Sequence, residues 1–213
     1  MSAAPSFAAL PRAAYGIIAT TVIALAALSS TPAFAQDYSY CTTCHGADGN
    51  GNAAIRAPKI SGMEDWYLRR QLERFREGQR GVHPQDDAGH EMRSVAAALT
   101  DAAAINGAVA YAVSFKPKTP PVTVQGNAER GRTLFQSCAA CHGAKGEGNA
   151  ALHAPALINQ SDWYLVTQLE RYRAGLRGSA PNDSEGAQMR AVAAALPDSV
   201  AVADVISYIN TLR

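Results

Sequence analysis

Two short clusters of cysteine and histidine in this chain have the composition and spacing of a cofactor attachment site. They are Cys41-Thr42-Thr43-Cys44-His45 and Cys138-Ala139-Ala140-Cys141-His142. In a C-x-x-C-H pattern both thiols can add to the vinyl groups of a porphyrin as thioethers, and the adjacent imidazole can bind the iron. On one helical turn, residues three and four positions apart share a face, so all three groups can reach one cofactor. The pattern predicts two covalent haem c groups.

Paired cysteines also occur in thioredoxin-like C-x-x-C sites and in halves of zinc sites. The histidine that follows at once, the glycine after it and the complete repetition favour haem over both alternatives. All four cysteines of the chain belong to the two clusters. None is left for a disulfide or a separate metal site.

A haem iron bound by one histidine has a sixth position, which a second side chain can fill. The candidates in the first half, each with its counterpart in the second, are Met63 (Gln160), His83 (Ala180), His90 (Ala187) and Met92 (Met189). Of these four candidates, only Met92 has a counterpart that can also bind iron. Both methionines stand at the same distance from their histidines, since 92 − 45 and 189 − 142 both equal 47. We predict that Met92 and Met189 are the axial partners of His45 and His142.

Two alternatives to these ligands stay open. A methionine is often a filler of hydrophobic cores, so each could serve packing alone. His90 is a second candidate for the first iron, whereas His83 and His153 are expected to be surface groups.

The region from Cys41 onward is an internal repeat with an offset of 97 residues, since 138 − 41 = 97. About half of the positions from Cys41 to Phe115 are identical in the second copy. Two copies are too few for a solenoid, so each should fold as a domain with its own core. The segment 116–125 contains three prolines and is predicted to be a semi-rigid linker. We predict a first domain at 36–115 and a second at 126–213.

Each copy is predicted to be helical. Segments 65–77 and 162–174 place apolar residues at i, i+4 and i+7, as at Leu68, Leu72 and Phe75, and a glycine follows each segment. Further helices are predicted at 101–115 and 198–212. No stretch alternates with period two for long enough to form a sheet, so the predicted class is all-α.

Residues 1–35 resemble an export signal. Arg12 precedes an apolar run, and Ala33-Phe34-Ala35 provides a cleavage site before Gln36. The alternative is an uncleaved anchor, but the run is shorter than the roughly 20 residues that a bilayer span requires. We predict cleavage near Ala35 and a periplasmic protein. Without Arg12, 19 − 1 = 18 basic residues balance 18 acidic ones, which argues against nucleic acid as a partner.

The order of C-x-x-C-H, a glycine-rich turn with Ala-Pro, a methionine and a C-terminal helix resembles a class I c-type cytochrome. Two such domains in tandem resemble the dihaem cytochrome c4 group, and the resemblance covers nearly the whole mature chain. It implies that a proline carbonyl binds the haem histidine and fixes its tautomer. Pro58 and Pro155, each 13 residues beyond its histidine, match that place, although either could be a simple loop proline.

One feature departs from this resemblance. The second copy has the expected leading helix at 127–135, but the first has only residues 36–40 before its motif. In the family that helix packs across the C-terminal helix. The first domain should therefore need another cover, from the second domain, the linker or a partner.

Iron with histidine and methionine ligands has no vacant site in either oxidation state, so the predicted function is electron transfer and not catalysis. The resemblance implies a periplasmic dihaem carrier between a quinol-oxidising complex or dehydrogenase and a haem-copper terminal oxidase or reductase. The alternative is a haem c subunit of a periplasmic dehydrogenase complex, associated with the membrane through its partner. A dihaem peroxidase would need one haem without a strong sixth ligand, which the two methionines disfavour.

Two further expectations concern the haem surroundings. Arg80 and Arg177 are candidates to bind the haem propionates, the alternative being solvated charges at helix ends. The short linker and the uncovered helix predict that the two domains pack against each other.

Overall fold

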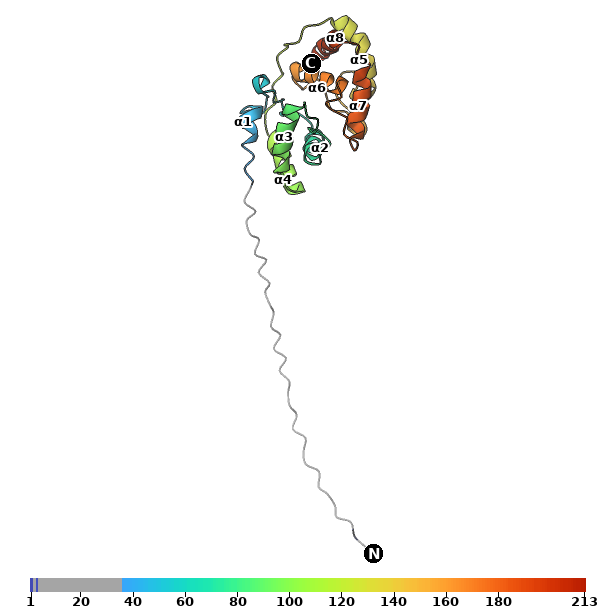
Figure 1. Cartoon of the computed structure of the whole chain (residues 1–213). Coiled ribbons are helices and arrows are strands. Elements are labelled where there is room, and N and C mark those ends of the chain that lie inside the picture. Colours follow the sequence, from blue (N-terminus) through green and yellow to red (C-terminus); the bar gives the residue numbers. More distant parts are fainter. Residues whose placement is uncertain (2, 4–35) are drawn as a thin grey trace. The chain divides into compact units, whose positions relative to one another are not determined.

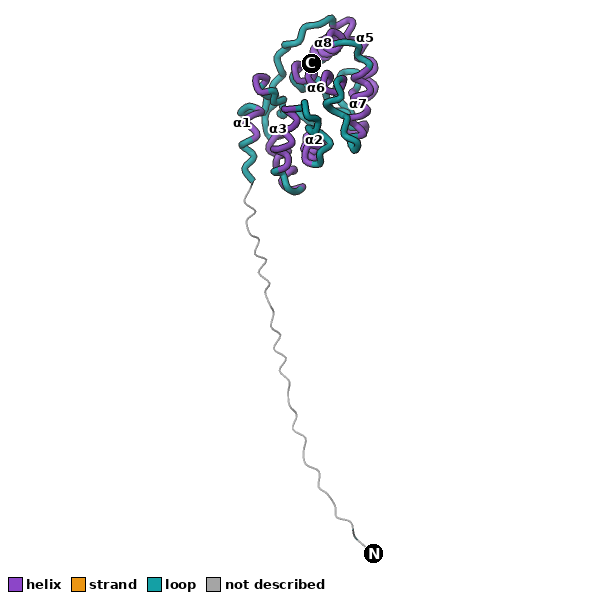
Figure 2. The backbone as a smooth tube through the Cα atoms, in the orientation of Figure 1, coloured by secondary structure: helices purple, strands orange, loops and turns teal. Residues whose placement is uncertain are grey.

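The computed structural model describes residues 1, 3 and 36–213 (Figures 1 and 2). Apart from positions 1 and 3, the predicted signal peptide at 1–35 lies outside the described residues. The helices are α1 (Cys41–His45), α2 (Asp65–Arg76), α3 (Asp87–Ala97), α4 (Ala102–Val113), α5 (Ala128–His142), α6 (Asp162–Arg173), α7 (Ser184–Ala194) and α8 (Ser199–Asn210), with 3-10 turns η1 (Ala53–Ile55) and η2 (Ala150–Leu152). The described residues contain no β-strand, only two isolated bridges, so the predicted all-α class is confirmed.

The four helices predicted from apolar spacing all form, with slightly earlier ends. Asp101 and Asp198 lie just outside α4 and α8, where their carboxylates accept hydrogen bonds from the backbone N–H groups of Ala104 and Ala201. This is the usual arrangement of a helix N-cap. At the other end of α2, Gly78 has a φ of 70°, which stops the helix.

Two helices were not predicted, and both carry a candidate ligand. Met92 lies in α3 and Met189 in α7. Glycine in the first turn of each helix resembles a loop in the sequence, but it has a steric reason. A Cβ at Gly89 would lie 2.1 Å from Oδ2 of Asp86, the residue that caps α3. The glycine therefore lets the cap close tightly over the start of the methionine helix.

In the second repeat, residues 126–213, α5 packs across α8 (Figure 1). The crossing is close at Gly131, where a Cβ would lie 1.9 Å from the backbone oxygen of Asp204. Phe135 of α5 joins Val205 and Ile206 of α8 in a core of fully buried side chains. The haem motif occupies the C-terminal end of α5, so this packing also positions Cys138, Cys141 and His142.

In the first repeat, residues 36–115, the leading helix is reduced to the five residues of α1, as the sequence predicts. Tyr38 occupies the place of Phe135, since 135 − 38 = 97, and its ring lies against α4 at Gly107. A Cβ at Gly107 would come within 2.3 Å of the Tyr38 hydroxyl. Tyr38 also packs on the small core of Leu99, Ile105 and Val109. The Tyr38 side chain thus buries part of the α4 surface that a longer leading helix would bury.

Replacing Tyr38 with alanine should destabilise the first repeat. Loss of a large, partly buried aromatic side chain from a small core is expected to lower the unfolding free energy by about 2–3 kcal/mol. Denaturant unfolding followed by circular dichroism measures the loss. Val113→Ala is the control, because Val113 lies on α4, the helix against which Tyr38 packs, but is 43% exposed. Equal losses in the two variants would contradict the role given to Tyr38.

Ion pairs and hydrogen bonds join the two repeats. Arg74 of α2 binds Asp183 at 2.7 Å, and Arg171 of α6 binds Asp86. These pairs are related by the 97-residue offset, since 74 + 97 = 171 and 86 + 97 = 183. The expected packing of the two repeats is therefore present.

Among the residues described, no single helix has the length and apolar character to cross a membrane, but two bent pairs, α3 with α4 and α7 with α8, meet the criteria together.

Candidate haem sites

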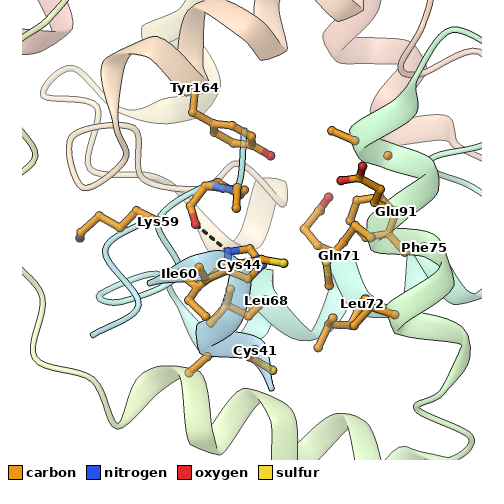
Figure 3. A pocket seen from close by; sticks show the side chains of 18 of the residues that line it. Cys41, Cys44, Lys59, Ile60, Leu68, Gln71, Leu72, Phe75, Glu91 and Tyr164 are labelled. Atoms are coloured by element: carbon orange, nitrogen blue, oxygen red, sulfur yellow. Dashed lines mark hydrogen bonds between the residues drawn. The ribbon is translucent and has the colours of Figure 1, made fainter. Parts of the chain in front are cut away.

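A cavity of about 220 Å³ in the first repeat brings together the residues predicted to bind the first haem. Cys41, Cys44 and His45 reach it from the single turn of α1, and Met92 reaches it from α3. The remaining lining is mostly apolar in area, and α2 and α4 contribute to it with Leu68, Leu72 and Val109. In Figure 3, Tyr164 of the second repeat lies across the cavity from Leu68 and Leu72 of α2.

The second repeat contains an equivalent cavity of about 190 Å³. Cys138, Cys141 and His142 line it from α5, and Met189 lines it from α7. All eight predicted site residues are thus divided between two cavities, four to each. His83 and His90 line neither cavity, whereas His153 lines the second, and its Nδ1 lies 2.7 Å from Oε1 of Glu185.

A proline carbonyl orients each motif histidine. Nδ1 of His45 lies 2.7 Å from the Pro58 oxygen, and Nδ1 of His142 lies 2.8 Å from the Pro155 oxygen. A carbonyl can only accept, so Nδ1 carries the hydrogen and Nε2 keeps its lone pair for a metal. The predicted contact between each proline carbonyl and its histidine is confirmed. Burial lowers the pKa of both imidazoles, and the carbonyls act in the opposite direction.

The loop from each histidine to its proline depends on a glycine. The backbone N–H of Gly51 donates to the His45 oxygen at 2.8 Å, and Gly51 has a φ of 88°. A Cβ there would lie 2.8 Å from the backbone nitrogen of Lys59. Gly148 has the same geometry in the second repeat, with a φ of 87°. The close approach brings the proline carbonyl to its histidine.

Four side chains form a closed ring of hydrogen bonds between the two cavities. Gln71 Oε1 accepts from Arg80 Nη1 at 2.7 Å and from Arg177 Nη2 at 3.0 Å. Gln168 Oε1 accepts from Arg177 Nη1 at 2.7 Å and from Arg80 Nη2 at 3.2 Å. Both glutamines line both cavities. Neither glutamine is among the residues predicted from the sequence, but their recurrence at the 97-residue offset is a signal that could have identified them.

The two arginines of this ring lie in the interface. Arg177 is only 7% exposed, so the alternative of a solvated charge at a helix end is wrong for it. The guanidinium of Arg80 lies 4.4 Å from the ring centroid of Phe75, and that of Arg177 lies 4.7 Å from that of Tyr172. Neither forms an ion pair with a carboxylate of the described residues. Two cations without a protein anion beside the cavities suit a cofactor that carries carboxylates.

These features fit haem c. Each cavity offers two thiols outside any disulfide, one oriented imidazole, one thioether and apolar walls. The arginines at the shared boundary supply the positive charge that propionate groups require.

Comparison with known proteins agrees with this geometry. The Cytochrome c family matches residues 34–114 and again residues 128–213, so the chain belongs to the cytochrome c family. It is 35% identical over 165 residues to the thiosulfate dehydrogenase electron acceptor of Stutzerimonas stutzeri, covering 71% of each chain. It is 32% identical over 184 residues to cytochrome c4 of Azotobacter vinelandii, covering 81% of this chain and 84% of that one.

A solved structure also shows the similarity to cytochrome c4. Reduced recombinant cytochrome c4 from Pseudomonas stutzeri superimposes with a TM-score of 0.62 and 29% identity, covering 82% of this chain and 94% of that chain. The protein is therefore cytochrome c4-like, with two cytochrome c domains and two covalently bound haem c groups. It is an electron-transfer protein and not an enzyme, as the sequence predicts.

Proposed function

We propose that Cys41 and Cys44 hold the first haem and that Cys138 and Cys141 hold the second. His45 and Met92 are the axial ligands of the first iron, and His142 and Met189 those of the second. The observation that supports this most strongly is the lining of the cavities. Each contains both cysteines, the histidine and the recurring methionine of one repeat. The haem supplies a one-electron ferric–ferrous couple, and the thioether ligand favours the ferrous state.

The protein side chains then perform three tasks. The proline carbonyls hold the imidazoles in the tautomer that can bind iron. The apolar walls exclude water from the metal, which disfavours reaction with small molecules. Arg80 and Arg177 bind haem propionates at the boundary between the domains. The domain limits that correspond to this arrangement are 36–115 and 126–213, with 116–125 as the linker.

The partners are redox proteins of the periplasm. We propose that the chain is exported with cleavage near Ala35, accepts electrons from a dehydrogenase or quinol-oxidising complex, and delivers them to a haem-copper terminal oxidase or another reductase. A relative named as an electron acceptor of thiosulfate dehydrogenase makes such a dehydrogenase the first donor to test.

The second candidate is a haem c subunit held permanently in a periplasmic dehydrogenase complex. The shortened start of the first domain favours it, because α4 is covered there by Tyr38 in place of a full helix. A partner protein could complete that cover.

Size-exclusion chromatography of a periplasmic extract, with haem staining of the fractions, distinguishes the two candidates. A freely diffusing carrier should elute at the volume of the monomer and be reduced in stopped-flow mixing with thiosulfate and a thiosulfate dehydrogenase. Elution only at the volume of a larger complex, together with a dehydrogenase, would contradict the carrier and support the subunit. A haem-stained protein confined to the cytoplasmic fraction would contradict both.

A further inference from the structure

A carboxylate of the first repeat reaches the haem-binding loop of the second. Glu64 is the residue just before α2, and its Oε1 accepts a hydrogen bond from the backbone N–H of Ala156 at 2.9 Å. Its second oxygen, Oε2, is buried and has no hydrogen-bond partner among the described residues. Glu64 is thus a partly buried carboxylate whose known hydrogen bond crosses the interface.

The position of this hydrogen bond links Glu64 to His142. Ala156 N and the Pro155 oxygen belong to one peptide group, and the Pro155 oxygen lies 2.8 Å from His142 Nδ1. Glu64 and His142 therefore bind opposite ends of the same amide. Hydrogen bonds in such a chain polarise one another. A negative charge at the N–H end makes the carbonyl a stronger acceptor, which draws the Nδ1 proton away from the ring and makes Nε2 a better electron donor.

The first haem site has a different residue at each of these positions. The counterpart of Glu64 is Ser161, since 64 + 97 = 161, and the counterpart of Ala156 is Lys59, since 156 − 97 = 59. Lys59 is 2% exposed, and its Nζ donates to the backbone oxygens of Ser61 and Asn159. The two repeats therefore differ in charge at the loop behind the haem histidine.

We propose that Glu64 is a positioning residue for the second haem. Through the Pro155–Ala156 peptide group it strengthens electron donation by His142 and lowers the reduction potential of the second haem, with little effect on the first. The inference rests on the proposed function, in which His142 binds the second iron. The reduction potential of the second haem then depends on a side chain of the first domain, so separating the two domains would change that potential.

The test is Glu64→Gln in the full dihaem protein. The amide keeps an oxygen that can accept from Ala156 N but removes the charge. The two potentials are measured in a redox titration followed by NMR, in which contacts of the haem methyl groups with assigned residues identify each haem. We expect the equilibrium constant for reduction of the second haem to rise about tenfold, about 59 mV for one electron. The first haem should change by much less, and the His142 Nδ1 proton resonance should shift.

Glu77→Gln is the matched control, because it removes the same charge from an exposed position at the end of α2 and should move neither potential. An unchanged second potential, or equal shifts of both haems, would overturn the inference. The wild-type spectrum tests the ligand assignment separately. If the imidazole bound to the second iron belonged to a histidine other than His142, the proposed ligation would fail, and the inference with it.

Discussion

Replacing Met189 with alanine is expected to leave the second haem covalently attached but to remove its sixth ligand. The thioether stabilises the ferrous state, so its loss should lower the potential of that haem by roughly 0.1–0.3 V, within the ~0.8 V range that axial ligands span. The iron should also change its spin state. Each methionine should account for about half of the methionine-to-iron charge-transfer absorbance, so Met92→Ala should remove the other half. Visible spectroscopy and redox titration measure both effects.

Met63→Leu is the control for this prediction. Met63 is 6% exposed and lines both cavities, but its counterpart in the second repeat is Gln160. It should therefore be a packing residue, and its replacement should retain the full charge-transfer band. Loss of the band in Met63→Leu, or its retention in both Met92→Ala and Met189→Ala, would show that the ligand assignment is wrong.

Replacing Arg74 with methionine should give the largest loss of stability at the interface. Arg74 is 7% exposed in its side chain and binds both Asp183 and Glu185, and Asp183 is 2% exposed. Removing one partner of a buried ion pair leaves an uncompensated charge and costs about 3–5 kcal/mol. Asp183 also caps α7, the helix that carries Met189. We therefore expect the second methionine ligand to be weakened as well.

The stability of Arg74→Met is measured by denaturant unfolding of the dihaem protein, and its dimensions are measured by small-angle scattering. Arg132→Met is the control, because Arg132 pairs with Glu129 on the surface, where the side chains are 66% and 83% exposed. Such exposed pairs contribute about 0.5 kcal/mol or less. Arg74→Met should unfold at lower denaturant and give a more extended scattering profile than the control. Two variants of equal stability and equal dimensions would contradict the importance of the buried pair.

Much of the site could be predicted from the sequence because its determinants are local. C-x-x-C-H is a pattern within one helical turn, and the geometry of a turn is sufficient to bring Cys41, Cys44 and His45 to one face. The methionine ligands could not be predicted from a local pattern alone. Met92 was selected over His90 because only Met92 recurs at the 97-residue offset. The repeat thus served as an internal comparison.

The two helices that carry the methionines were missed for a physical reason. Glycine has a low helix propensity, so Gly89 and Gly186 resemble a loop in the sequence. Their function becomes clear only when the capping aspartate is seen in contact with them. A Cβ at Gly186 would lie 1.9 Å from Oδ2 of Asp183. Tertiary packing here outweighs the intrinsic preference of the residue.

By itself, the sequence determined the two haem motifs, the repeat, the helical class and, within residues 36–115, the short segment that precedes the first motif. These depend on residue identity and on spacing along the chain. The tertiary structure alone decided which residues meet across the repeats: the ring of Gln71, Gln168, Arg80 and Arg177, the ion pairs of Arg74 and Arg171, and the contact of Glu64 with the loop of His142. The residues that these contacts join across the repeats are 85 to 111 positions apart, since 171 − 86 = 85 and 185 − 74 = 111. Their partners depend on how two folded surfaces fit together, which no local pattern encodes.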